Sequence, residues 1–174
     1  MECTETEHEV IDNFLPSDVF AELQTLLLPS ESIENSKEQI LWYYTPNKTD
    51  WKLFQLTHMV YKNTREGLIT SPLYEKIIPH YRKSLDIKEL IRIKINMYPN
   101  TQNVQEHRIH IDWTWTHKAA IFSINTCDGY TKLEDGTKID SVANRMLIFN
   151  GSTFHCSTTT TNQSVRMNIN FNYF

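Results

Sequence analysis

Two segments of the chain alternate strictly between apolar and polar side chains, and this alternation restricts the fold more than any other feature. A period of two residues is typical of a β-strand with one buried face. In one strand alone the polar face would as readily point to water, but two strands with the same split favour a shared polar interior. We expect the polar rows to face each other across a jelly roll, around a wet cavity, with the apolar faces packed outward against helices. The rows are Arg166, Asn168, Asn170 and Asn172 in segment 165–173, and Arg92, Lys94, Asn96 and Tyr98 in segment 91–98.

Helices are expected before these strands. Apolar residues at helical spacing follow Pro16-Ser17, and a second set follows Ser71-Pro72. After about residue 90 the chain breaks into short strand-like runs, with a hairpin signal at Asp135-Gly136. The pattern predicts an α+β, mainly β fold, a sandwich or jelly roll with N-terminal helices packed on one sheet. The strand-like runs are 108–115, 119–125, 130–133 and 146–149.

The totals fit one globular domain. The chain has 174 residues, 40% of them hydrophobic, and four glycines, which leaves no room for a long linker. A single domain is therefore expected over residues 1–174, with a helix-rich part at about 1–88 and a metal-binding jelly-roll core at about 89–174. The formal net charge is −4, and the absence of a basic stripe argues against a nucleic-acid partner.

Cysteine usage and the ends of the chain indicate a compartment. Cys3, Cys127 and Cys156 form no C-x-x-C pair and are odd in number, which favours reduced thiols over a disulfide scaffold. The polar, acidic first nine residues do not resemble a signal peptide, and no apolar run reaches 18 residues. We expect a cytoplasmic protein with no membrane span.

His110 and Asp112 are separated by one residue in the strand-like run 108–115. Residues i and i+2 of a strand share a face, about 7 Å apart along the backbone, so both side chains can converge on one ion. His155, which follows an apolar run and a glycine turn at residues 150–152, is the candidate third ligand. Two histidines and one carboxylate are typical of non-haem Fe(II) oxygenases, and the same donors suit zinc. The pattern predicts a metal centre and leaves both metals open.

Arg166 favours iron with an oxo-acid cosubstrate. It lies 11 residues after His155, on the polar row of the next strand. A guanidinium in the same cavity offers a bidentate grip on a carboxylate, such as the distal one of 2-oxoglutarate. The alternative is a surface arginine that faces solvent, which the neighbouring asparagines make less favourable.

Four motifs succeed one another in the second half of the chain: Asn96-x-Tyr98, His110-x-Asp112, His155 and Arg166-x-Asn168. Their order resembles that of the 2-oxoglutarate/Fe(II)-dependent dioxygenases. The opening Val10-Ile11-Asp12-Asn13-Phe14-Leu15-Pro16 before a helix, and Gly129-Tyr130-Thr131 between the ligands, resemble the prolyl 4-hydroxylase-like branch. The resemblance covers most of the chain, and its specific part is residues 96–172.

This resemblance implies a double-stranded β-helix and an oxidative decarboxylation of 2-oxoglutarate to succinate and CO2, with O2 consumed and a C–H bond hydroxylated. Fe(II) would lie on the three predicted ligands. The resemblance assigns the distal carboxylate of 2-oxoglutarate to Arg166 and Tyr98, and the carboxylate and keto end to Asn96 and Asn168.

One agreement with the family and two departures from it bear on the expected reaction. Asp112 stands where halogenating relatives carry a small residue, which favours hydroxylation. Asn172 stands where the nucleic-acid demethylase branch has a second arginine, which counts against base repair. Residues 99–107 replace the glycine-containing segment that often precedes the His-x-Asp motif. The expected substrate is prolyl, another peptidyl group or a small molecule, because fold and cofactor do not set the substrate.

Two other functions compete with this hypothesis. A jelly-roll binding module would keep the metal ligands without turnover, although such a relic could lose any one of them freely. A zinc hydrolase on a similar barrel would need neither Arg166 nor Tyr98, and no carboxylate stands out near the ligands as a general base. We favour catalysis by an oxygenase.

Several side chains near the ligands have two interpretations. Trp113 and Trp115 either wall the substrate site or belong to the core. Arg108 shares the face of His110 and either contacts substrate or lies on a solvated rim. His107 and His117 have no carboxylate two residues away, so we expect them to be loop histidines and not ligands.

Overall fold

The computed structural model describes residues 7–28, 40–47 and 53–174; Cys3 lies outside these residues. Cys127 and Cys156 are buried free thiols. None of the described helices is both long and apolar enough to cross a bilayer. The elements, in chain order, are β1 (His8–Ile11), α1 (Ser17–Leu27), β2 (Tyr43–Pro46), β3 (Phe54–Thr64), β4 (Gly67–Thr70), α2 (Leu73–Tyr81), β5 (Leu90–Pro99), β6 (Lys118–Ser123), β7 (Tyr130–Leu133), β8 (Lys138–Asp140), β9 (Met146–Asn150), β10 (His155–Ser157) and β11 (Val165–Tyr173).

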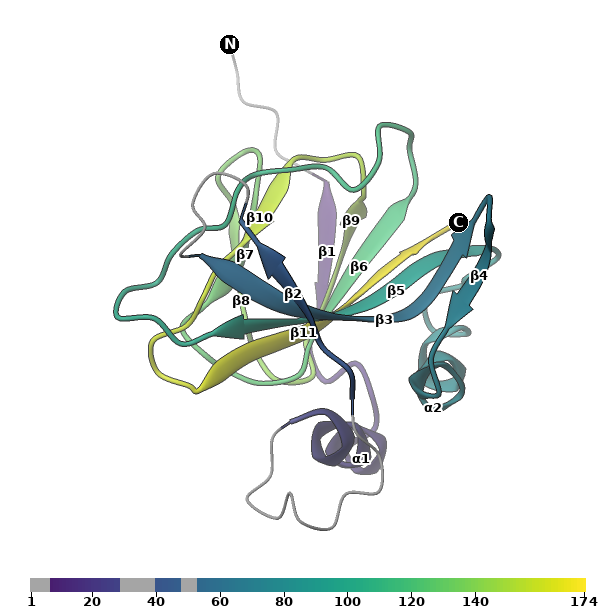
Figure 1. Cartoon of the computed structure of the whole chain (residues 1–174), viewed down its shortest axis with the longest axis horizontal. Coiled ribbons are helices and arrows are strands. Elements are labelled where there is room, and N and C mark those ends of the chain that lie inside the picture. Colours follow the sequence, from purple (N-terminus) through teal and green to yellow (C-terminus); the bar gives the residue numbers. More distant parts are fainter. Residues whose placement is uncertain (1–6, 29–39, 48–52) are drawn as a thin grey trace.

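Two antiparallel sheets form the β part of the molecule. The large sheet has the order β1-β9-β6-β11-β5-β3-β2, with β4 paired to β3, and the small sheet has the order β10-β7-β8. Figure 1 shows the small sheet at the left of the view, away from α1 at the bottom and α2 at the right. This mainly β jelly roll with two helices confirms the predicted fold class.

Each face of the large sheet has its own core. Strands β5, β6 and β11 pack their apolar side chains against both helices, in one cluster that includes Leu23, Ile77, Ile95 and Phe171. On the other face, β6 and β9 pack against Leu133 of the small sheet in a second, smaller cluster. The expected packing of the N-terminal helices against the apolar strand faces is confirmed.

The expected arrangement of the two polar rows is wrong. Strands β5 and β11 are neighbours in the large sheet, so their rows lie side by side on one face and do not oppose each other across a cavity. In an antiparallel pair, residues that are directly opposite share a face. The register pairs Arg166 with Tyr98, Asn168 with Asn96, Asn170 with Lys94, and Asn172 with Arg92. One continuous polar surface therefore faces the small sheet.

The predicted strand at 108–115 is not formed. Residues 106–117 are irregular and touch segment 155–158, which begins with β10, through two isolated bridges, Glu106 to Thr158 and His110 to His155. Glu106 and His110 are four residues apart, whereas their partners Thr158 and His155 are only three residues apart. The first segment therefore has one extra residue, which interrupts the ladder. The hairpin at Asp135-Gly136 is confirmed: it joins β7 to β8, and Gly136 has a φ of +90° that favours glycine.

Candidate metal centre

The three predicted ligands lie together. Suitable donor atoms of His110, Asp112 and His155 all lie within 4.8 Å of one another. His155 is the first residue of β10, and the irregular segment is tied to it by two backbone hydrogen bonds, each 2.9 Å, between His110 and His155. The i, i+2 spacing predicted that the two side chains converge because they share the face of a strand. No strand is present there, and the two hydrogen bonds to His155 position His110 instead.

Both histidines have the same orientation. Nδ1 of His110 lies 3.1 Å from the carbonyl oxygen of Arg108, and Nδ1 of His155 lies 2.9 Å from that of Thr153. A carbonyl oxygen only accepts hydrogen bonds, so each Nδ1 carries the proton and donates it. Each Nε2 is left with a free lone pair, as a metal ligand requires.

Asp112 is held at both oxygens. Arg92 donates to Oδ1 at 2.6 Å, and the side-chain amide of Asn172 donates to Oδ2 at 2.8 Å. The Nε of Arg92 in turn donates to Oδ1 of Asn172 at 3.1 Å, which closes a ring of three side chains. Burial alone would raise the pKa of Asp112, but Arg92, His155 and Asn172 together hold this pKa below its usual range. The carboxylate is therefore charged and oriented before any metal binds.

His117 belongs to this network, which the sequence did not reveal. It is buried, its Nδ1 donates to the carbonyl oxygen of Trp115, and its Nε2 accepts from Asn172 at 3.2 Å. A Cβ at Gly151 would lie 2.1 Å from that Nε2, so this glycine is required for close approach. The glycine turn before His155 was the available signal, but nothing in the sequence linked it to His117.

The tryptophans that follow the ligands have a supporting role. Arg92 lies over the ring of Trp113, 4.7 Å from its centroid. Trp115 stacks on Phe174 with centroids 5.4 Å apart and is 41% exposed. Neither ring lines the cavity at the metal ligands. Trp113 and Trp115 therefore neither line this cavity nor belong to the buried core.

Removing Asn172 is expected to weaken metal binding. In Asn172→Leu, Asp112 loses one donor and Arg92 loses an acceptor, so the carboxylate is less well oriented. Loss of such partners typically costs about 10–100-fold in metal affinity. Calorimetric titration of the chelator-treated protein with Co²⁺ measures the change. Asn168→Leu, on the same row but without contact to a ligand, is the matched control; equal losses in both variants would contradict the orienting role.

The pKa values of the buried His155 and the half-buried His107 are lowered to about 4. Desolvation is the main cause for both His155 and His107, and the positive charge of Arg166 adds to it at His107. In the unfolded chain a histidine titrates near 6.5. Between pH 6.5 and 4 the unfolded state therefore binds more protons than the folded state, and the stability of the folded state falls as the pH falls.

The metal-free protein is accordingly expected to lose stability steadily from about pH 6.5 to 4. Urea unfolding with chelator present, at several pH values across this range, measures the slope. His107→Gln removes one of the two groups and makes the slope shallower. A flat profile for the wild type would contradict the prediction.

Two cavities that share lining residues, Lys94 and His110 among them, lie at the candidate ligands. An outer cavity of about 560 Å³ is lined by His110 and Asp112, and an inner one of about 30 Å³ by His110 and His155. The inner cavity contains orphaned polar atoms: Asn96 Oδ1, Asn168 Nδ2 and Asn170 Oδ1 are buried without a hydrogen-bond partner among the described residues. Buried polar atoms are normally satisfied, so this cavity is suited to a polar ligand.

Arg166 is 1% exposed and lies behind the inner cavity. It donates to the carbonyl oxygen of Thr158 at 3.3 Å and to the hydroxyl of Thr131 at 3.0 Å, while its buried Nε has no partner among the described residues. A Cβ at Gly129 would lie 2.6 Å from its Cδ, so the predicted Gly129-Tyr130-Thr131 strand leaves room for this side chain. The guanidinium carbon lies 5.3 Å from the centroid of the Tyr98 ring.

Tyr98 and Lys94 complete the polar surface. Burial raises the pKa of Tyr98, so its hydroxyl keeps its proton and can donate. Lys94 lines both cavities, and burial, helped by the charge of Arg92, lowers its pKa to about 8. Its ammonium group is therefore still largely protonated at neutral pH.

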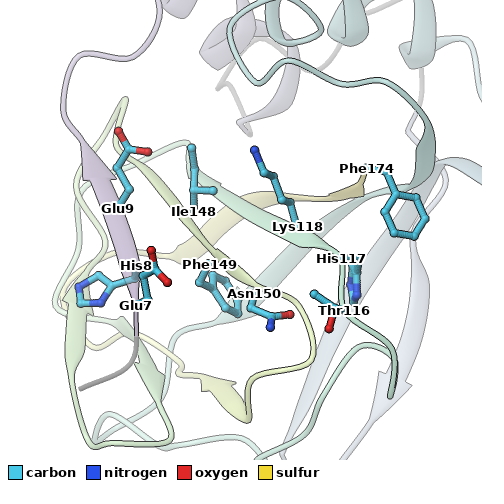
Figure 2. Close-up of a pocket in the computed structure, with 10 residues that line it drawn as sticks. All are labelled: Glu7, His8, Glu9, Thr116, His117, Lys118, Ile148, Phe149, Asn150 and Phe174. Carbon is cyan, nitrogen blue, oxygen red and sulfur yellow. The ribbon is translucent and has the colours of Figure 1, made fainter. Parts of the chain in front are cut away.

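A further cavity of about 570 Å³ lies outside this centre. Figure 2 shows it beside β1, with Glu9, Ile148 and Lys118 in a row at one side and His117 and Phe174 at the other. None of the three candidate ligands lines it. We assign no chemistry to this surface.

Comparison with known proteins identifies the fold. No family model matches the sequence, and no curated protein sequence matches it. Among solved structures, an oxidoreductase of the 2OG-Fe(II) oxygenase family from Burkholderia pseudomallei is similar with a TM-score of 0.67 and 9% identity, over 95% of this chain and 84% of that one.

Two prolyl hydroxylases are similar over nearly the whole chain. One, from Trichoplax adhaerens in complex with a hypoxia inducible factor peptide fragment, has a TM-score of 0.64 and 16% identity, over 99% of this chain and 86% of that one. The other is the viral collagen prolyl hydroxylase of Paramecium Bursaria Chlorella virus-1 in complex with 2OG, with a TM-score of 0.57 and 14% identity, over 99% and 97%. The chain has the fold of the 2-oxoglutarate/Fe(II) oxygenases, prolyl 4-hydroxylases included.

Proposed function

We propose that this chain, which has the fold of the 2-oxoglutarate/Fe(II) oxygenases, is itself a non-haem Fe(II) and 2-oxoglutarate-dependent dioxygenase. It hydroxylates a C–H bond of a prolyl, other peptidyl or small-molecule substrate and releases succinate and CO2. The observation that carries the proposal is the cluster of His110, Asp112 and His155, whose donor atoms lie within 4.8 Å of one another. Two imidazoles and a carboxylate on one side of an ion leave positions open for other ligands.

The donor set fits Fe(II). Both imidazoles present an unprotonated Nε2, and the carboxylate is charged and held by Arg92 and Asn172. In the proposed enzyme, His110, Asp112 and His155 hold the metal. Iron and 2-oxoglutarate, when bound, supply the oxidising chemistry with O2.

The residues behind the metal ligands fit 2-oxoglutarate. Arg166 has an unpartnered Nε and a charge that no described carboxylate neutralises, and Tyr98 has a protonated hydroxyl nearby. We assign the distal carboxylate to these two residues. Asn96 and Asn168, which are joined by a 2.9 Å hydrogen bond and each have one orphaned atom, are assigned to the carboxylate and keto end.

The inner cavity must widen when the cosubstrate binds. Its volume of about 30 Å³ has room for only about two water molecules. Arg166 is closed off by its hydrogen bonds to Thr131 and Thr158. We infer that 2-oxoglutarate displaces water from the orphaned amides and takes up the free donors of the guanidinium. The chain's own contribution is to exclude water there and to orient both ends of the diacid.

A zinc hydrolase is disfavoured by the lining of the cavities. Among the described residues of both cavities, Asp112 is the only carboxylate, and it is a candidate ligand. A hydrolase would need a second group to activate water. The orphaned amides and the buried guanidinium would also be without a role.

The test is a spectrum of the anaerobic protein with Fe(II) and 2-oxoglutarate. Chelation of the keto acid by ferrous iron gives a weak visible charge-transfer band. We expect the band in the wild type, its absence in His110→Ala, and succinate on exposure to O2. A folded, metal-loaded wild type without the band would refute the oxygenase and promote a binding module.

A further inference from the structure

The outer cavity is lined by cations. Arg92, Lys94 and Arg108 line it, and the half-buried His107 lies beside them. Asp112 is the only carboxylate among the described lining residues. The whole chain has a formal net charge of −4, so a cavity lined mainly by cations is not expected from its composition. Charge of one sign in a cleft raises the local concentration of oppositely charged ligands.

The positive charge is not neutralised from within. Asp112 is bonded to Arg92 at 2.6 Å, and its remaining interactions are with Asn172 and the metal-ligand histidine His155. Lys94 has no hydrogen bond or ion pair with any described residue, and the only acid that acts on it is Asp112. Lys94 lines both cavities, so its ammonium group is available to an anionic ligand that enters either of them.

Arg108 adds a second unpaired cation. Its backbone carbonyl accepts from Nδ1 of His110, a candidate metal ligand that follows it by two residues. Its side chain has no hydrogen bond or ion pair with the described residues, and it lines the same cavity as Lys94. Ile109 and Phe154 provide apolar walls beside these two cations. The cavity thus combines two free cations with a surface for a carbon skeleton.

We propose that the outer cavity binds a primary substrate that carries a carboxylate, with Lys94 as its principal contact and Arg108 as the second. This inference rests on the proposed function, because it takes the cavity next to the metal ligands as the substrate site. It deepens that function by naming the substrate class: an organic acid or an acidic peptide side chain. It also assigns Arg108 to substrate contact, one of the two roles that the sequence left open.

The cosubstrate does not account for the same charges. Three of the four residues assigned to 2-oxoglutarate, Arg166, Asn96 and Asn168, do not line the outer cavity, whereas Tyr98 lines both cavities. Lys94 does border the inner cavity as well. The experiment must therefore separate a carboxylate on the substrate from one on 2-oxoglutarate.

Benzoate and benzamide are matched probes, since they share a shape and differ in charge. Binding of each is measured by saturation-transfer NMR on the Zn²⁺-loaded protein with saturating 2-oxoglutarate, so that the cosubstrate site is occupied. We expect benzoate to bind at least about tenfold more tightly than benzamide, which corresponds to about 1.4 kcal/mol. In Lys94→Met the preference falls to about twofold or less, and in Arg108→Gln it falls partway. The exposed Lys88 gives a control, Lys88→Met, with unchanged preference.

Each alternative outcome has a distinct meaning. Equal binding of the two probes, or no binding of benzoate, overturns the proposal. A Lys94→Met variant that loses affinity for 2-oxoglutarate but keeps the benzoate preference overturns it too, since Lys94 then serves the cosubstrate. Failure of 2-oxoglutarate to bind the wild type would instead refute the proposed function. A benzoate preference of the Zn²⁺-loaded protein that falls in Arg108→Gln would still report on the outer cavity, because Arg108 does not line the inner one.

Discussion

The His155→Ala variant is expected to bind divalent metal more than about 100-fold more weakly than the wild type. Loss of a partner of a ligand typically costs 10–100-fold, and loss of a ligand itself should cost more. His155 is buried, and its Nε2 is presented by the hydrogen bond that Nδ1 donates to Thr153, so the variant keeps only two of the three candidate donors. Calorimetric titration with Co²⁺, and with Fe(II) under anaerobic conditions, measures the affinity.

His107→Gln is the matched control for this loss. His107 is the other histidine with a strongly lowered pKa, and it lines the outer cavity without belonging to the ligand cluster. Its replacement should leave the metal affinity within a few-fold of the wild type. A similar loss in both variants would mean that the ion lies elsewhere in the cavity.

The Arg166→Met variant is expected to lose about 100-fold or more in affinity for 2-oxoglutarate. Hydrogen bonds to charged groups contribute about 1.5–3 kcal/mol each, and a bidentate contact makes two of them. Each 1.4 kcal/mol is about tenfold in affinity. Titration of the anaerobic Fe(II) protein with 2-oxoglutarate, followed by its visible band, measures the loss, and metal affinity without 2-oxoglutarate should be unchanged.

Stability separates this role from a structural one. Arg166 is almost fully buried, with an unpartnered Nε and no described carboxylate to neutralise it. Replacement of such a charge by an apolar side chain of similar length is often neutral or stabilising. We therefore expect the ligand-free Arg166→Met protein to be at least as stable as the wild type in urea. A large loss of stability with unchanged affinity for 2-oxoglutarate would show that the guanidinium only supports the fold.

Much of the sheet could be predicted from residues 90–173. Strands β7 and β11 begin and end where the sequence patterns place them. In β11 both faces are buried, and the period-two signal comes from one apolar and one polar face. The pairing of β5 with β11 could not be predicted, since the alternation tells which residues share a face and not which strand is the neighbour. The polar rows were therefore expected to oppose each other, and they lie side by side.

The site was partly predictable for a similar reason. His110, Asp112 and His155 follow from spacing and residue type, and the structure brings them together. The strand expected at 108–115 is replaced by an irregular segment, because one extra residue breaks the ladder with β10. The link between Asn172 and His117 depends on a contact over 55 positions and has no local signal. Such long-range polar contacts come from the topology alone.

The side-by-side polar rows also have a consequence for folding. Because successive side chains of a strand point to opposite faces, a slip of β11 by one residue against β5 would turn Arg166 toward the helices and Phe171 toward the metal ligands. Such a slip would move four polar side chains into the apolar core against the helices and five apolar ones onto the polar surface that faces the small sheet. A register shift that distorts the site therefore also disrupts the core, so a chain with this shift would not be stably folded. Burial of the apolar face of β11 against the helices therefore also fixes the position of its polar side chains at the candidate metal centre.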